Sequence, residues 1–221
     1  MNARPFGTCF FENYAQISLS ALLGSEFDCL VNIDRPDLQS EDGHSIGIEV
    51  TRAMEESKRA EESLLRDIAG ITPAPLDAEM EQILENGYAY GLEEGRYIGV
   101  KELPYWSMAL PLKRIIQSKV SKVGNGFYGK FDQMGLFVFC RDNLREAGAL
   151  RTMNYTLSLQ KNQDLRYDRL YLADINDLFV CNLADGLNVS SRLSRYPISQ
   201  ENRKAFYAEA LRRQNHKTDP Q

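Results

Sequence analysis

The sequence predicts a mixed α/β domain in which helices flank a central sheet, and three observations favour this class. Ser45–Thr51 alternates between apolar and polar residues, as a strand with one buried face does. Leu136–Cys140 is a near-continuous apolar run, which is typical of a strand buried on both faces. Phe11–Leu23 and Leu110–Val123 carry apolar side chains at helical spacing, so we expect two helices that pack on the sheet.

The first of these helices leads into a strand. Phe11–Leu23 is expected to end at Gly24, because glycine is common just beyond helix ends. Phe27–Ile33 then alternates as a strand. Its buried face would hold Phe27, Cys29, Val31 and Ile33.

A second strand follows after a break in the chain. Arg35-Pro36 interrupts the first strand, and Leu38–His44 is short and polar. Asp42-Gly43 within that stretch predicts a turn into Ser45–Thr51. The core-facing residues of this second strand would be Ile46, Ile48 and Val50.

The rest of the chain also mixes helices and strands. Further helices are expected at Arg52–Ile68, Leu76–Glu85, Asp142–Leu150 and Gln200–Arg213, and further strands at Arg169–Ile175, Leu178–Leu183 and Leu187–Leu193. A segment around residues 71–107, rich in Gly and Tyr over 86–99, is interpreted either as an insertion that covers a site or as an ordered surface loop.

The composition is that of an ordinary globular protein. At 221 residues, without an internal repeat or a separating linker, the chain is interpreted as one domain over residues 1–221. No apolar stretch is long enough to span a bilayer and no secretory signal opens the chain, so we expect a cytoplasmic protein with no membrane partner. The four cysteines, at positions 9, 29, 140 and 181, lack paired metal spacing and are interpreted as reduced core residues.

One strand carries a chemical anomaly. Glu49 stands on the polar face of Ser45–Thr51, and a carboxylate on an apolar strand costs free energy unless a cation, a donor or solvent meets it. Asp37 lies upstream and could point to the same place, where two hard oxygen ligands would suit a magnesium-type ion. The spacing leaves a second interpretation open, in which this is an edge strand whose polar face is solvated.

The helix Leu110–Val123 carries another anomaly. Lys119 falls inside its apolar stripe, four residues after Ile115 and three after Ile116, and Lys122 flanks the stripe. Burying an ammonium group is costly without a partner. The lysine could instead extend along the apolar surface to reach water.

The segment 113–130 is basic and contains no acid. Its cations are Lys113, Arg114, Lys119, Lys122 and Lys130, and Phe127 and Tyr128 lie among them. Contacts to a phosphate backbone need cations and little else, so this segment indicates phosphate binding. The net charge of −5 argues against a protein coated in nucleic acid, but it leaves room for a local basic groove.

The order of helix, strand, Pro36–Asp37, then a strand ending in Glu49-Val50-Thr51 resembles the PD-(D/E)XK nuclease superfamily. The resemblance covers roughly the first third of the chain and implies a restriction-endonuclease-like fold. It also implies that Asp37, Glu49 and the Val50 carbonyl hold Mg²⁺ or Mn²⁺, with Glu12 as the additional acid that some members use.

The resemblance fails at one position. Thr51 stands where the family has a lysine that helps to activate the attacking water. A threonine hydroxyl carries no charge and cannot replace a cation beside a developing oxyanion. The family implies that a lysine on a neighbouring helix can supply that charge, and Lys119 is the best-placed substitute, with Lys122 behind it.

Three classes of function stay open. The first is a metal-dependent nuclease that cuts DNA or RNA with Asp37 and Glu49. The second is a catalytically inactive, nuclease-like module that binds nucleic acid or a protein partner. The third is a structural protein whose acids only form a solvated sheet face. The sequence does not indicate an oligomeric state, and a homodimer stays open.

Overall fold

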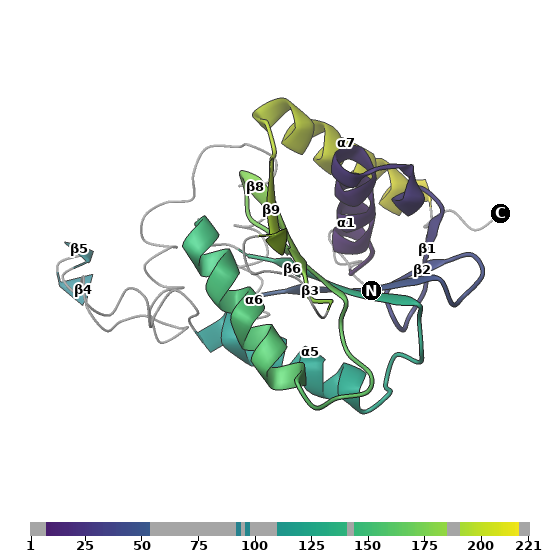
Figure 1. Ribbon diagram of the computed structural model, residues 1–221. Helices are drawn as coiled ribbons and strands as arrows, with labels where there is room; N and C mark the ends of the chain where they lie inside the picture. Colours follow the sequence, from purple (N-terminus) through teal and green to yellow (C-terminus); the bar gives the residue numbers. More distant parts are fainter. Residues whose placement is uncertain are drawn as a thin grey trace, which may run out of the picture.

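A seven-stranded mixed sheet lies between two layers of helices (Figure 1). The computed structural model describes residues 8–53, 92–93, 96–97, 110–140, 144–184 and 191–216. The strands of this sheet are β1 (Leu30–Asn32), β2 (Leu38–Ser40), β3 (Ile46–Arg52), β6 (Gln133–Phe139), β7 (Arg169–Ala173), β8 (Asp177–Asn182) and β9 (Leu193–Pro197). The helices are α1 (Thr8–Leu23), the 3-10 helix η1 (Ser25–Phe27), α5 (Leu110–Gly124), α6 (Glu146–Gln160) and α7 (Gln200–His216). Two further strands, β4 (Leu92–Glu93) and β5 (Arg96–Tyr97), pair with each other.

The centre of the sheet is parallel and both ends are antiparallel. The strand order is β1-β2-β3-β6-β7-β8-β9, and β3, β6 and β7 are parallel neighbours. Because β3 lies between β2 and β6, it is not an edge strand. The predicted sheet of Phe27–Ile33, Ser45–Thr51 and Leu136–Cys140 is confirmed in its membership, although the bounds of its strands differ.

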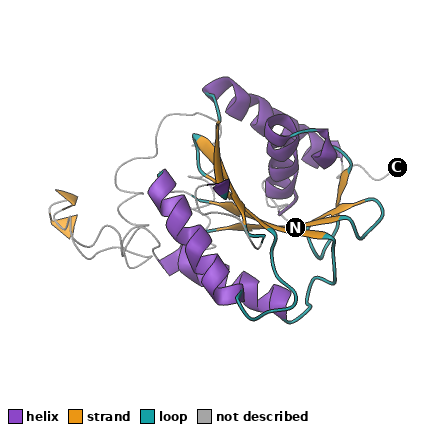
Figure 2. Cartoon of the chain, viewed as in Figure 1, coloured by secondary structure: helices purple, strands orange, loops and turns teal. Residues whose placement is uncertain are grey.

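Among the described residues, two helices cover each face of the sheet (Figure 2). α1 and α7 pack on one face, where Ile48, Phe137 and Phe139 belong to their core. α5 and α6 pack on the other face, where the core includes Leu136 and Val138. Neighbouring residues of β6 therefore enter different cores, which confirms the strand buried on both faces. Since Ile48 faces α1, the next residue, Glu49, points to the side that α5 covers.

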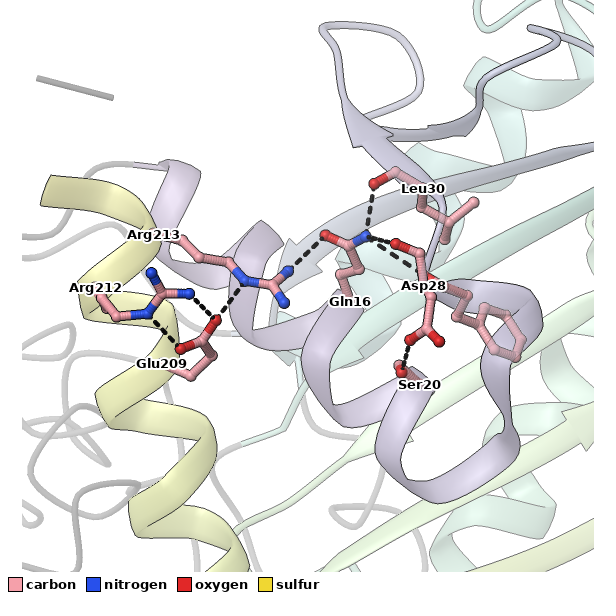
Figure 3. Close-up of polar contacts among 8 residues, drawn as sticks. Gln16, Ser20, Asp28, Leu30, Glu209, Arg212 and Arg213 are labelled. Atoms are coloured by element: carbon pink, nitrogen blue, oxygen red, sulfur yellow. Dashed lines mark hydrogen bonds and ion pairs between the residues drawn. The ribbon is translucent and has the colours of Figure 1, made fainter. Parts of the chain in front are cut away.

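Gln16 ties α1 to the edge of the sheet and to the C-terminal helix (Figure 3). Its amide nitrogen lies 2.6 Å from the Leu30 carbonyl oxygen and 3.1 Å from that of Asp28. Its side-chain oxygen accepts a hydrogen bond of 3.2 Å from Arg213 on α7, and Glu209 in turn orients Arg213. One buried side chain thus joins three segments that are far apart in the sequence.

The predicted phase of the first strand is wrong. Phe27 lies in η1, the strand begins only at Leu30, and Leu30 is its buried residue. Val31 and Ile33, which were expected in the core, are 36% and 50% exposed. Cys29 is exposed too, so among the cysteines whose burial is described, only Cys140 and Cys181 match the expected core position.

Other boundaries also differ from the predicted ones. Leu38–Ser40 is a strand although its sequence is polar, because it pairs with β1 on one side and β3 on the other. The expected helix Asp142–Leu150 begins at Glu146 and continues to Gln160. Of the expected strand Leu187–Leu193, residues 187–190 lie outside the described residues, and β9 begins at Leu193. The expected helices Arg52–Ile68 and Leu76–Glu85 and the segment 71–107 lie outside the described residues, apart from residues 52–53, β4 and β5.

Candidate functional site

A glutamate on β3 and a lysine on α5 meet between the sheet and the helix. Lys119 Nζ lies 2.5 Å from Glu49 Oε1, and the two side chains are 15% and 9% exposed. The position of Lys119 on the inward stripe of its helix predicted this contact. The interpretation of Glu49 as a residue on a solvated sheet face is wrong, because α5 covers that face and β3 is internal.

Asp37 reaches the same strand from the turn before β2. Its Oδ2 accepts a 2.7 Å hydrogen bond from the Val50 backbone N–H. Leu38 pairs with Ile48, so a continued register would place Pro36 opposite Val50. The carboxylate of Asp37 thus satisfies a strand N–H just beyond the end of the ladder. This bond holds the aspartate beside the residue that follows Glu49.

The charges around Asp37 show which groups are its neighbours. Burial, the negative charge of Glu49 and that of Glu12 raise the pKa of Asp37 to about 7, while the Val50 hydrogen bond and Lys119 act in the opposite direction. Glu12, buried on α1, is therefore close enough to act on Asp37 through its charge. We call Glu12, Asp37, Glu49 and Lys119 the carboxylate–lysine cluster.

Two tyrosines that the sequence analysis did not assign to a site lie against this cluster. Tyr128 is 4% exposed, and within the described part of the chain its hydroxyl has no hydrogen-bond partner of ordinary geometry. Burial and then the negative charge of Glu49 raise the pKa of Tyr128 far above its usual value. Tyr167 is fully buried, and its hydroxyl donates to the Lys119 carbonyl oxygen over 3.4 Å. Both phenols stay neutral and form the inner wall of the cluster.

The loop after α5 packs over the Glu49 face of β3. Gly47 lies on that face two residues before Glu49, and a Cβ atom there would come within 2.8 Å of the Phe131 ring. Gly47 is therefore a site of close approach that lets Phe131 lie on the strand. Tyr128, three residues earlier, approaches Glu49 from the same loop.

Several other residues that the sequence singled out lie outside the cluster. Lys122 is exposed, and its ammonium stands 5.1 Å from the centre of the Phe127 ring, so Lys119 is the lysine that reaches Glu49. Lys113 lies 5.6 Å from the Tyr155 ring on α6, and Arg114 and Lys130 are exposed on the surface. Asp34, an acid three residues before Asp37, is almost fully exposed and pairs with Arg35.

The cluster has the chemistry of a site for a hard divalent cation. Glu49 contacts the Lys119 ammonium, and burial first, then the negative charges of Glu49 and Glu12, raise the pKa of Asp37, so a cation beside Asp37 would favour its ionised form. Within the described ranges, no three His, Cys, Asp or Glu side chains are already grouped as metal ligands. That Asp37, Glu49 and the Val50 carbonyl hold a metal ion stays a prediction.

A scan of family models, a search of curated proteins and a search of solved structures each found no match to this chain. Within the part of the chain that the structure describes, no helix is both long and apolar enough to cross a membrane.

Proposed function

We propose that this protein is a metal-dependent phosphodiesterase that cleaves nucleic acid in the manner of the PD-(D/E)XK nucleases. The observation that carries the proposal is the contact between Lys119 and Glu49, at 2.5 Å. This contact places an ammonium group beside Glu49, which lies two residues before Thr51. Thr51 occupies the position where the family has its lysine. The charge that Thr51 cannot provide comes from another helix.

The energetics of the cluster favour a functional role over a structural one. A buried ion pair loses hydration on both partners, and a hydrophobic pair of the same volume is often as stable. Asp37 and Glu12 lie close enough to interact with this pair, and burial, then the charges of Glu49 and Glu12, raise the pKa of Asp37 to about 7. Groups with strongly shifted pKa values in such surroundings cluster at catalytic sites.

The topology around the cluster also supports a restriction-endonuclease-like fold. Asp37 precedes β2 and Glu49 lies in β3, so the two acids come from antiparallel neighbours. α5, which carries Lys119, leads into β6, and β6 pairs with β3 in parallel. α1, which carries Glu12, packs on the opposite face.

In the proposed reaction each residue has a separate task. Asp37 and Glu49 would hold Mg²⁺ or Mn²⁺, which polarises a phosphate and lowers the pKa of a water molecule. Lys119 places its ammonium where negative charge develops in the transition state. Glu12 adds negative charge that favours cation binding. Lys113, Arg114, Lys122 and Lys130 are the exposed cations available to the phosphate backbone.

A cleavage assay with paired variants tests the proposal. Wild-type protein with Mg²⁺ or Mn²⁺ should cut labelled DNA or RNA, and EDTA should stop the reaction. Glu49→Gln should remove the activity, whereas Glu41→Gln should keep it, because Glu41 is an exposed glutamate in the turn before β3. Cleavage that persists in Glu49→Gln would refute the assignment of the site.

The second candidate is a module that binds nucleic acid without cutting it. The observation that favours it is Thr51, which leaves the family position of the lysine without charge. If wild-type protein binds DNA or RNA but cuts neither with Mg²⁺ nor with Mn²⁺, this second function replaces the first.

A further inference from the structure

An exposed aromatic ring lies at the end of α5, beside the cluster. Phe127 is 47% exposed. The Gly126 N–H donates to Val123 O at 3.0 Å, and the Phe127 N–H donates to Lys122 O at 3.1 Å. With Gly126 at a φ of 72°, these bonds form a Schellman motif, which fixes the residue after the glycine relative to the helix. The ring is therefore held in place on the surface.

Two cations stand against this ring. The Arg35 guanidinium carbon lies 5.2 Å and the Lys122 ammonium nitrogen 5.1 Å from the ring centre. At an exposed site each such contact is worth about 0.5–1 kcal/mol, whereas stacking a nucleic-acid base on an aromatic ring is worth about 1–3 kcal/mol. A base can thus displace a cation from the ring, and the cation remains close enough to meet a neighbouring phosphate.

Each of these three groups lies close in the chain to a residue that belongs to the carboxylate–lysine cluster or packs against it. Arg35 precedes Asp37 by two residues, and Lys122 follows Lys119 by nearly one helical turn. The Phe127 ring packs edge to face on Tyr128, with centres 5.2 Å apart, and Tyr128 lies against Glu49. The side chains of Phe127 and Tyr128 therefore connect the surface to Glu49.

Building on the proposed function, we propose that Phe127 stacks an unpaired base next to the phosphodiester that is cut, so that the substrate is single-stranded nucleic acid. Arg35 and Lys122 then bind the phosphates on either side of that nucleotide. A duplex hides the faces of its bases within the stack, whereas a single strand presents them to an aromatic ring. The combination of exposed ring and adjacent cations therefore selects unpaired nucleotides.

Fluorescence anisotropy in EDTA tests this selection without cleavage. The probes are single-stranded DNA, single-stranded RNA of the same sequence, and the corresponding DNA duplex. Phe127→Ala should weaken binding of the single strands about 5- to 150-fold, the loss expected for one stacked base, and leave duplex binding unchanged. Phe127→Trp should retain binding. Comparison of the two single strands shows whether the sugar matters.

One control and one further variant make the result specific. Val31→Ala removes another exposed apolar side chain, on β1, and should leave all three affinities as in wild type. Lys122→Ala should reduce the slope of log affinity against log salt by about 0.7 for a single strand, which corresponds to one lost phosphate contact.

The outcomes separate this inference from the proposed function. Equal losses for single strands and duplex, or no loss in Phe127→Ala, would overturn the inference, even if the wild-type protein cuts nucleic acid. Selective loss of single-strand binding in a protein that cuts nothing would support the inference and refute the nuclease proposal.

Discussion

Burying Lys119 and Glu49 removes both charged groups from water, and this loss of hydration costs free energy. In water, an exposed pair of this kind contributes little, and in the interior its attraction barely offsets the lost hydration of both ions. The cluster nevertheless keeps Glu49 and Lys119 in contact beneath α5, and the charges of Glu49 and of Glu12 on α1 both act on Asp37. At the scale of single residues, we propose that these carboxylates bind a divalent cation.

Replacing Lys119 tests its role in the transition state. We predict that Lys119→Ala lowers kcat about 100- to 1,000-fold while substrate affinity changes little, because the ammonium acts on charge that develops during the reaction. Single-turnover cleavage kinetics and anisotropy measure the two quantities separately. Thr51→Lys on the Lys119→Ala background should restore part of the rate. Full metal-dependent activity in Lys119→Ala would rule this lysine out.

The raised pKa of Asp37 predicts that the free energy of unfolding depends on pH. Its pKa is raised from 3.8 to about 7 in the folded protein, so folding favours the protonated form. The stability that this proton confers is fully present below pH 4 and is lost as the pH rises through 7. We therefore predict that, without divalent metal, Asp37→Asn matches wild type near pH 4 and becomes the more stable protein above pH 7. Urea denaturation across this range measures the difference.

Wild type and Asp37→Asn also show whether a bound metal ion offsets the cost of ionising Asp37 in the folded protein. Added Mg²⁺ should stabilise wild type at pH 8, because binding to the folded state shifts the unfolding equilibrium, and should have no such effect on Asp37→Asn. A difference between the proteins that is constant with pH would contradict the shifted pKa.

At the scale of elements, α1 positions the site by holding the edge of the sheet. Gln16 satisfies backbone carbonyls of the segment that leads into β1, and Arg213 links it to α7 (Figure 3). The chain continues from β1 to the turn that carries Asp37, where the Ile33 N–H bonds to the Asp37 carbonyl at 2.7 Å. The anchor therefore lies a few residues from the cluster.

Gln16→Leu should destabilise the fold by about 1–3 kcal/mol, since it keeps the apolar volume but leaves buried carbonyls without a donor. The control is Gln117→Leu on the exposed side of α5, which should change stability by no more than about 0.5 kcal/mol. Chemical denaturation measures both, and equal effects of the two variants would show that the Gln16 hydrogen bonds contribute nothing.

The elements that the sequence predicted well have a regular pattern. β3, α1 and α5 each follow one period of apolar residues, which indicates burial on one face, and β6 is a continuous apolar run, which indicates burial on both faces. The predicted end of α6 was too early because Thr152 and Thr156 are polar residues inside the helix. Both are buried, and their hydroxyls donate hydrogen bonds to carbonyls four residues earlier. Such local bonds satisfy a hydroxyl inside a helix, so the polar residues interrupt the apolar pattern without ending the helix.

At the scale of the whole molecule, the sequence predicts those site residues that interrupt a pattern of apolar residues. Glu49 interrupts an apolar strand and Lys119 an apolar helical stripe, so the sequence alone marks both as residues in need of a partner. Tyr128 and Tyr167 break no pattern, because a buried tyrosine is ordinary in a core. Their approach to Glu49 and Lys119 depends on how the loop after α5 and the start of β7 pack, which no local pattern encodes.

The net charge of −5 also matters at this scale, because it opposes the approach of a polyanion. A nuclease built on this chain must rely on local cations around α5 and on the divalent ion to bring a phosphate to Asp37 and Glu49. Its activity therefore depends on whether that ion binds between these two carboxylates.

Anomalous diffraction from crystals soaked in Mn²⁺ at pH 8 tests this claim most directly. The account predicts one strong anomalous peak within direct bonding distance of carboxylate oxygens of both Asp37 and Glu49, and its loss in Glu49→Gln crystals treated in the same way. A fully ordered cluster without a peak, or Mn²⁺ bound only at exposed surface acids, would contradict it.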